Sequence, residues 1–276
     1  MNIPSVTGHM IVKNEDRFLW YAITSILPYL DRLIIYDTGS KDGTLEIIKS
    51  FHTDKIKWFS KTVRDPVDLA KLRQEQLDLY KDEWIWIIDG DEVYPNSLCV
   101  EIRNLIRGGD KLEGIVVGRF DLLGDIYHYQ NPGVGTYELF GKRGHFVLRL
   151  IHVSNIPGLH VSGAYPFEGY YDMQGHELTQ HIRQKFAFTT ERLFHAMYLH
   201  RSTLGPSLPS TFHRDKYKIE WGISIPSKIK IPEVFFSTRP EFVSNASVKR
   251  SIVYSIIAIF ITPIKILKRY FTRILK

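Results

Sequence analysis

The sequence has 276 residues, 44% of them hydrophobic and 24% charged, which suits one large domain or a domain with an appendage. Cys99 is its only cysteine, so an internal disulfide is excluded and a reducing, cytosolic environment is the simplest setting. The net charge is +6, but residues 242–276 contain seven basic residues and no acidic one, so the remaining chain is nearly neutral. This distribution argues against a nucleic-acid-binding protein, and the N-terminus lacks the basic start and apolar stretch of a signal peptide.

Apolar runs alternate with helical patterns through the first 110 residues, which predicts strand–helix units around a mostly parallel sheet. Thr44 is expected to cap the second helix. The last strand of this series has no polar alternation and is therefore expected to be buried on both faces. In chain order, the predicted elements are a strand at 9–13, a helix at 16–27, a strand at 32–37, a helix at 45–51, a strand at 55–60, a helix at 66–80 and a strand at 84–89.

The pattern is looser after residue 110. Two further strands are predicted at 114–123 and 145–153, with a glycine-rich loop between them, and residues 155–180 are aromatic, histidine-rich and irregular. No G-x-G-x-x-G sequence follows the first strand and the chain contains no Walker loop, which disfavours a dinucleotide-dependent oxidoreductase.

The strand at 84–89 runs directly into three acidic residues, Asp89, Asp91 and Glu92, in the stretch IWIIDGDEVYP. Ligands gather at the carboxyl ends of strands in parallel α/β sheets, and like charges this close repel one another unless a cation lies between them. The cluster therefore predicts a site for Mg²⁺ or Mn²⁺ together with a diphosphate. The alternative is an acidic surface turn that caps the next helix.

The sequence contains four motifs, MIVKNED (10–16), IIYDTGSKDGT (34–44), LAKLRQEQL (69–77) and WIWIIDGDE (84–92). Their order and spacing resemble those of family-2 glycosyltransferases of the GT-A fold. The resemblance implies an α/β fold with a Rossmann-like, mostly parallel central sheet flanked by helices. With the change of pattern near residue 110, it predicts a nucleotide-sugar-binding half at 1–110, an acceptor-binding half at 111–241 and a tail at 242–276.

The resemblance also implies roles for single residues of the first half. Asp37 would read the base of the nucleotide and Val12 would lie beneath that base. Arg73 would approach the nucleotide or its phosphates, although Gln74 follows it where asparagine is more usual; the alternative is a solvated helix arginine. Asp89 would contact the ribose or the metal, and Asp91 would be the principal metal ligand.

The second half is expected to supply a further metal ligand and a general base. The segment RLFHAMYLHRS (192–202) places His195 and His200 near the end of an element, and similar enzymes bring a histidine from this region to the metal. His195 is the preferred ligand, against a purely structural histidine. Glu177, in the sequence GHE, is the candidate base. A competing alignment uses His160 and leaves Glu168 or Asp172 as the base.

The tail combines an uncharged stretch with a basic, amphipathic one. Residues 252–264 carry no charge but are shorter than the ~20 residues needed to cross a bilayer, and Pro263 is expected to interrupt them. The segment 249–276 is therefore expected to contact an anionic membrane surface; the alternative is a helix that packs on the body or on a second subunit. The basic residues assigned to one helical face are Lys265, Lys268, Arg269, Arg273 and Lys276, and the apolar ones on another are Leu267, Tyr270, Phe271 and Ile274.

These observations converge on a metal-dependent, inverting glycosyltransferase with Mn²⁺ or Mg²⁺ as cofactor. Its expected partners are a nucleotide-diphosphate sugar, most simply a UDP-sugar, and a glycan or lipid-linked acceptor, on the inner face of the cytoplasmic membrane. Two alternatives stay open: a metal-dependent phosphoryl or nucleotidyl transferase, and a catalytically silent nucleotide-sugar-binding anchor subunit.

Overall fold

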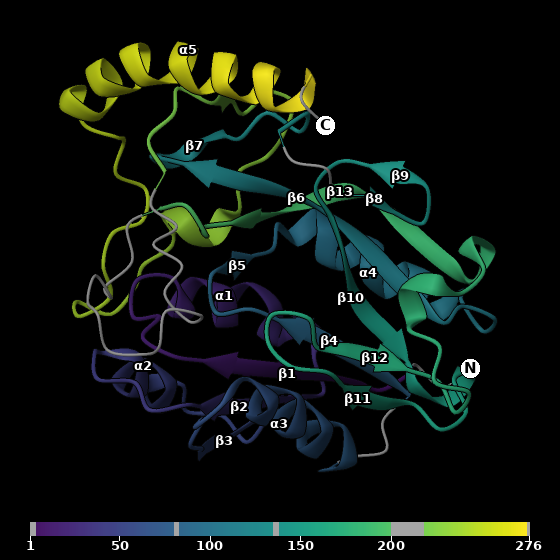
Figure 1. Cartoon of the computed structure of the whole chain (residues 1–276). Helices are drawn as coiled ribbons and strands as arrows, with labels where there is room; N and C mark the ends of the chain where they lie inside the picture. The colour runs from purple at the N-terminus through teal and green to yellow at the C-terminus, as the bar shows by residue number, and fades with distance from the viewer. Residues whose placement is uncertain (1–3, 80–82, 135–137, 200–217, 275–276) are drawn as a thin grey trace.

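A curled sheet forms the centre of the protein (Figure 1). The structure is a computed structural model that describes residues 4–79, 83–134, 138–199 and 218–274. Within these residues the sheet has ten strands, eight of which follow the order β14-β7-β6-β10-β4-β1-β2-β3. The other two, β5 and β13, pair with each other, and β13 also pairs with β6. The predicted α/β class is confirmed.

The first half of the chain forms the parallel part of the sheet, as predicted. Strands β1, β2, β3 and β4 pair in parallel in the order β3-β2-β1-β4. Their bounds are β1 (Val6–Val12), β2 (Arg32–Asp37), β3 (Ile56–Ser60) and β4 (Trp84–Ile88), with helices α1 (Leu19–Ile26), α2 (Thr44–Ser50) and α3 (Pro66–Leu79) between them. Every residue of β4 is buried, as its continuous apolar sequence predicts.

The second half adds strands of both directions, so the parallel arrangement does not extend through the whole sheet. Strand β10 lies antiparallel between β4 and β6, whereas β13 runs parallel to β6. The main elements are α4 (Asn96–Arg107), β6 (Gly114–Leu123), β10 (Phe146–His152) and β13 (Phe186–His195), and the shorter strands are β5 (Glu92–Val93), β7 (Asp125–Tyr129), β8 (Glu138–Leu139), β9 (Lys142–Arg143), β11 (His160–Ser162), β12 (Gly169–Tyr171) and β14 (Ile223–Ser224). Short 3₁₀ turns connect them: η1 (Leu27–Tyr29), η2 (Val153–Asn155), η3 (Leu178–Gln180), η4 (Arg183–Lys185) and η5 (Glu233–Phe236).

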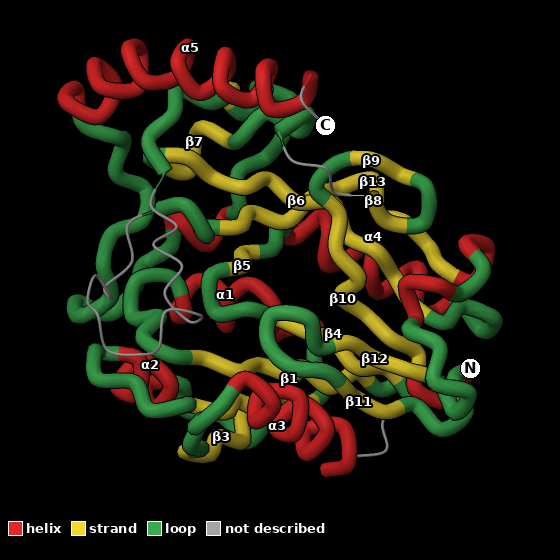
Figure 2. Tube along the Cα trace, viewed as in Figure 1, coloured by secondary structure: helices red, strands yellow, loops and turns green. Residues whose placement is uncertain are grey.

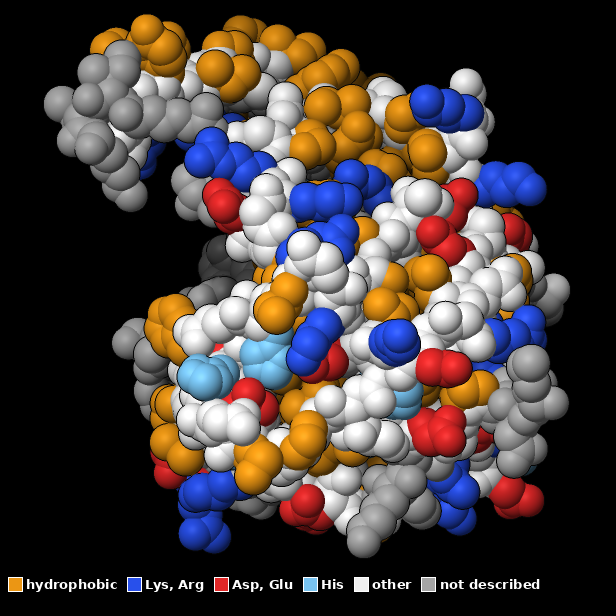
Figure 3. All heavy atoms as spheres, turned by 90° about the vertical axis from the view of Figure 1, so that its right-hand side faces the viewer, with side chains coloured by type: hydrophobic (Ala, Val, Ile, Leu, Met, Phe, Trp, Pro, Cys, Tyr) orange, Lys and Arg blue, Asp and Glu red, His pale blue; other side chains and the backbone are white. Residues whose placement is uncertain are grey.

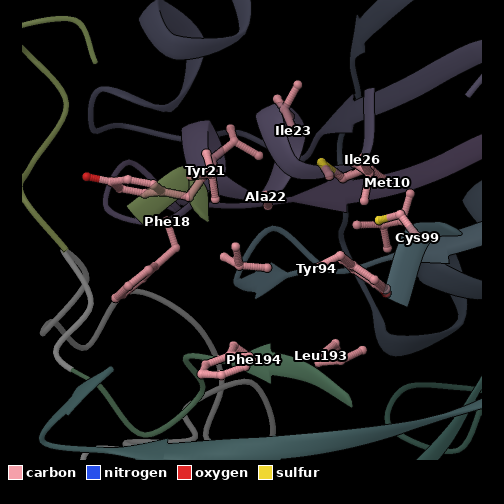
Figure 4. Close-up of a cluster of buried hydrophobic side chains, with 14 of the residues drawn as sticks. Met10, Phe18, Tyr21, Ala22, Ile23, Ile26, Tyr94, Cys99, Leu193 and Phe194 are labelled. Atoms are coloured by element: carbon pink, nitrogen blue, oxygen red, sulfur yellow. The ribbon is translucent and has the colours of Figure 1, made fainter. Parts of the chain in front are cut away.

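Alternation along the strands divides the interior into two faces. On β2, Leu33 and Ile35 join the large core that includes residues of α1, α2 and α4, whereas Ile34 and Tyr36 pack against Leu72 of α3. Figure 4 shows part of the large core, where side chains of α1, β5, α4 and β13 meet. Cys99 lies in this cluster, and burial raises the pKa of its thiol.

Two local predictions were wrong. Thr44 does not cap α2: it is the first residue of the helix, and its hydroxyl instead accepts the backbone N–H of Glu15 at 2.8 Å. Pro263 does not interrupt the tail, since α5 (Ile252–Ile274) continues through it as one helix (Figure 2).

Candidate active site at the strand ends

Three predicted donor-binding residues, Val12, Asp37 and Asp89, lie at the carboxyl ends of β1, β2 and β4. Val12 and Asp37 are register partners at the ends of β1 and β2. The Asp37 carboxylate is buried and accepts the backbone N–H groups of Gly39 and Ser40. A Cβ atom at Gly90 would lie 3.1 Å from Cγ1 of Val12, so a larger residue would press on β1 and glycine suits this close approach of the acidic turn.

The pairing of β13 places its last residue in the centre of the acidic cluster. His195 is the register partner of Glu92 on β5 and of Asp121 on β6. Side chains of directly paired residues lie within reach of one another. The expectation that His195 ends a structural element near the acids is therefore confirmed. His200, the other histidine of this segment, lies outside the described residues.

His195 lies between two buried carboxylates. Its Nε2 lies 3.5 Å from Oδ1 of Asp91, and its Nδ1 lies 3.1 Å from Oδ1 of Asp121. Burial alone would raise the pKa of Asp121, but hydrogen bonds with His145 and His195 and the charge of Arg119 outweigh it and hold that pKa well below its usual range. Asp121 thus stays ionised and fixes the orientation of the imidazole, with Nε2 directed at Asp91.

Arg149 is a site residue that the sequence reasoning missed. The register between β10 and β6 shifts from Leu148 to Leu150, which makes Arg149 the extra residue of a β-bulge. Its Nη2 donates to Asp89 and Glu92 at 2.5 Å each, and its Nε donates to Glu92 at 3.1 Å. An arginine inside an apolar strand sequence was the available signal.

Arg149 corrects the argument that the repulsion among the three acids requires a metal. Glu92 is fully buried and both of its oxygens are engaged, one by Arg149 and the other by the Tyr94 hydroxyl at 3.1 Å. A protein cation therefore bridges two of the three acids, Asp89 and Glu92, and offsets one of their two negative charges. The repulsion argument for a metal is weaker than the sequence suggested, but Asp91 and one further negative charge are not offset by Arg149.

Asp89 connects this buried pair with the open side of the site. Its side chain is 37% exposed although Arg149 holds one oxygen. Partial burial would raise the pKa of Asp89, but the charges of Arg149 and Arg73 hold it well below its usual range. The charge of Arg73 in α3 thus acts on Asp89, and its Nε lies 3.6 Å from Oε1 of Glu168.

The donor atoms around His195 fit a divalent cation. Asp89, Glu92 and His195 offer ligand atoms within 4.8 Å of one another, and the 3.5 Å separation of Asp91 and His195 is near the ~3 Å between adjacent ligands of an octahedral Mg²⁺. Glu92 is engaged by Arg149 and Tyr94, which leaves Asp89 and His195 of this group, and Asp91 approaches His195 from outside it. The carboxylates suit Mn²⁺ or Mg²⁺, and the imidazole is a ligand more typical of transition metals.

The candidate bases lie between Glu168, just before β12, and Glu177, just before η3. Glu177 precedes η3, and its carboxyl carbon would lie 3.3 Å from a Cβ atom at Gly169. No contact that joins Glu177 to the acids is seen in the described part of the chain. Glu168 contacts the site through Arg73, whereas Asp172 is engaged by backbone N–H groups of its own loop and by His181. The assignment of Glu177 as base stays a prediction.

Fold and site together define an α/β protein with an acidic, partly arginine-neutralised site at the carboxyl ends of its parallel strands. The sequence model of the family described as glycosyl transferase family 2 matches residues 9–159, more than half of the chain. The protein belongs to this family. The match begins within β1, covers β2, β3 and β4, and extends through β10, the strand that carries Arg149.

Known proteins resemble parts of the chain. The SPbeta prophage-derived glycosyltransferase SunS of Bacillus subtilis strain 168 is 29% identical over 104 residues, which are 38% of this chain and 24% of SunS. The chain thus spans about a quarter of the length of the curated relatives it matches. Among solved structures, residues 1–349 of Staphylococcus aureus TarS align with a TM-score of 0.38 and 13% identity over 52% of this chain and 47% of that one. Glucosyl-3-phosphoglycerate synthase from Mycobacterium tuberculosis, in complex with Mn²⁺, UDP and phosphoglyceric acid, aligns with a TM-score of 0.34 and 19% identity over 42% and 43%.

Proposed function

We propose that the protein transfers a sugar, with inversion, from a nucleotide-diphosphate donor to a hydroxyl acceptor, and that the donor is a UDP-sugar. The observation that carries the proposal is the meeting of Asp91 and His195 at 3.5 Å, beside the strand ends that hold Val12 and Asp37. Family membership supports the reaction class. The family alone does not define the nucleotide, so UDP rests on the position of Asp37.

The donor would bind along the ends of β1, β2 and β4. Asp37 would accept a hydrogen bond from the base, and Val12 would pack beneath it. Arg73 supplies a positive charge on the same side as Asp89, where the diphosphate of the donor needs a cation. The exposed oxygen of Asp89 is free to contact the ribose or the metal, since Arg149 fixes the other one.

Asp89, Asp91 and His195 would hold Mn²⁺ or Mg²⁺. A divalent ion at this position supplies charge stabilisation for the departing diphosphate. The protein contributes the orientation of its ligands: Asp121 fixes the His195 ring and Arg149 fixes Asp89.

An acceptor hydroxyl must lose its proton as it attacks the anomeric carbon. The new bond joins the acceptor oxygen to the sugar, the bond to the diphosphate breaks, and a carboxylate takes the proton. We assign this role to Glu177, with Glu168 as the alternative because of its contact with Arg73.

The substitution Glu177→Gln is expected to lower kcat of transfer by about 10²- to 10⁴-fold with little change in the thermal shift given by the donor. The shape of the side chain is kept while its basicity is removed. Initial rates of nucleotide release in the presence of acceptor measure the effect. Glu168→Gln is the matched comparison, and loss of kcat only in that variant transfers the role to Glu168.

We further propose that residues 1–110 bind the donor and residues 111–241 shape the acceptor site. Residues 249–276 would attach the protein to the inner face of the cytoplasmic membrane, and the acceptor would be lipid-linked or a surface glycan. None of the helices in the described residues has the length and apolar character required to span a bilayer.

The proposal is tested by a screen of UDP-, GDP- and dTDP-sugars for thermal stabilisation, with and without Mn²⁺. The expected result is a metal-dependent shift with a UDP-sugar and, with acceptor present, release of UDP. Release of a nucleotide monophosphate or of pyrophosphate would instead indicate phosphoryl or nucleotidyl transfer. Binding of the donor without turnover on any acceptor would indicate a silent binding subunit.

A further inference from the structure

Helix α5 lies across one end of the protein (Figure 1). The Tyr254 hydroxyl donates to the Glu220 carbonyl at 3.1 Å, and the Thr262 hydroxyl accepts the backbone N–H of Trp221 at 2.8 Å. Arg269 donates to the Glu220 carboxylate at 2.5 Å. The side of the helix that faces the body therefore combines hydrogen bonds and ion pairs with the buried side chains of Tyr254 and Ala258.

The opposite side of α5 exposes large apolar side chains to the solvent. Figure 3 shows hydrophobic side chains gathered along this helix at the top of the molecule. Ile252 is 79% exposed and Phe260 is 70% exposed. The full set comprises Ile252, Val253, Ile256, Ile257, Ile259, Phe260, Ile264, Ile266, Leu267, Tyr270 and Phe271.

This orientation is the reverse of that of an ordinary surface helix, which turns its apolar stripe towards the core. A helix that only completed the body would bury these isoleucines and expose its lysines. Contiguous apolar patches of this kind mark interaction sites on soluble proteins. The alternative in which the helix packs on the body is therefore correct about that contact. It does not explain the apolar side, which has no partner among the described residues.

The width of the apolar side favours a lipid surface over a second helix. Sequence neighbours such as Ile256 and Ile257, or Tyr270 and Phe271, are both exposed, although neighbours on a helix point about 100° apart. A helix–helix seam covers a narrower stripe. A bilayer interface, by contrast, accepts the whole outward half of a helix that lies in its plane.

The charges of α5 are divided between the body and the edge of the apolar side. Lys265 and Arg269 are turned towards Glu220, so they do not face a membrane on the apolar side. Lys249 and Lys268 are exposed, and the sequence 242–276 contains no acidic residue to oppose lipid phosphates. Of the predicted cationic face, Lys265 and Arg269 are therefore engaged within the protein, whereas Lys268 is exposed.

We propose that α5 lies flat in the interface of a lipid bilayer, with its apolar half inserted among the acyl chains, and that this insertion rather than attraction to anionic lipids supplies most of the binding. The inference rests on the membrane attachment proposed above and specifies its side and its chemistry. Exposed Lys249 and Lys268 reach lipid phosphates, which zwitterionic lipids also carry.

Flotation of the full chain with phosphatidylcholine vesicles, and with vesicles that also contain phosphatidylglycerol, tests the inference. We expect binding to both, and we expect it to persist in about 0.5 M NaCl, where exposed charges are strongly screened. The double variant Phe260→Glu/Ile264→Glu is expected to reduce the bound fraction by more than about 10-fold, because each substitution removes an inserted apolar side chain.

Ile182→Glu is the matched control. Ile182 is 64% exposed and Ile264 is 65% exposed, so the same substitution is made at equal exposure on and off the helix. The control is expected to bind vesicles like the unaltered chain, and the melting temperature of every variant checks folding.

Three outcomes would overturn the inference in different ways. Binding only to phosphatidylglycerol vesicles and release by salt would keep the membrane attachment but assign it to charge. Absence of vesicle binding, with a dimer in light scattering that the double variant dissociates, would identify a second copy as the occupant. Absence of both would remove the attachment itself, while the donor-dependent thermal shift would still report independently on the transferase site.

Discussion

The substitution Asp91→Asn is expected to abolish the Mn²⁺-dependent part of the thermal stabilisation by a UDP-sugar and to lower the transfer rate by about 10²- to 10³-fold. Asp91 is buried, and its Oδ1 lies 3.5 Å from Nε2 of His195. Asparagine keeps the volume of the side chain but removes the charge that a divalent ion requires. Melting curves with donor, at increasing Mn²⁺ concentrations, measure the effect.

Asp54→Asn serves as the control, because Asp54 is exposed before β3 and the substitution removes the same charge. This variant is expected to keep the full Mn²⁺-dependent shift. If Asp91→Asn also kept it, Asp91 would not be a metal ligand, and the acidic turn would have only a structural role.

The acidic turn could be located from the sequence because strand ends are local features. The uninterrupted apolar run at 84–88 predicts a buried strand, and its position in the parallel series places Asp89 and Asp91 at the ligand-binding edge. The same reasoning placed Asp37 at the end of its strand, which the bounds of β2 confirm. The segment RLFHAMYLHRS (192–202) likewise predicted that His195 lies near the end of an element, and His195 is the last residue of β13.

The supporting residues of the site could not be found in this way, because long-range strand pairing positions them. Asp121 lies within an apolar strand, and only the parallel pairing of β13 with β6 brings it to His195. Arg149 depends on a β-bulge in a strand that inserts between β4 and β6. Periodicity predicts neither the order of strands in a sheet nor the position of a bulge.

The orientation of α5 was also beyond the sequence. Its pattern shows an apolar side and a basic side, but an amphipathic pattern does not specify which side meets the body. The deciding partner is Glu220, a buried carboxylate distant in sequence from Lys265 and Arg269. Lys265 and Arg269 of the cationic side therefore face the protein.

The substitution Arg149→Met is expected to lower the free energy of unfolding by about 3–5 kcal/mol, because it leaves the carboxylate of Glu92 buried without its cation. Glu92 has no solvent exposure, and Arg149 contributes two of its hydrogen-bond donors. Unfolding in urea, followed by tryptophan fluorescence, measures the change. Lysine at this position keeps the charge but not the forked geometry of the guanidinium, so an intermediate loss is expected.

The double variant Arg149→Met/Glu92→Gln separates a buried ion pair from a general packing defect. Glutamine removes the uncompensated charge and still accepts from the Tyr94 hydroxyl, so the double variant is expected to be more stable than Arg149→Met alone. The unaltered protein, Arg149→Met, Glu92→Gln and the double variant form a double-mutant cycle. A coupling energy well above about 0.5 kcal/mol in this cycle supports direct pairing. Additive losses would show that Arg149 acts through packing, and the three acids would again need an external cation to relieve their repulsion.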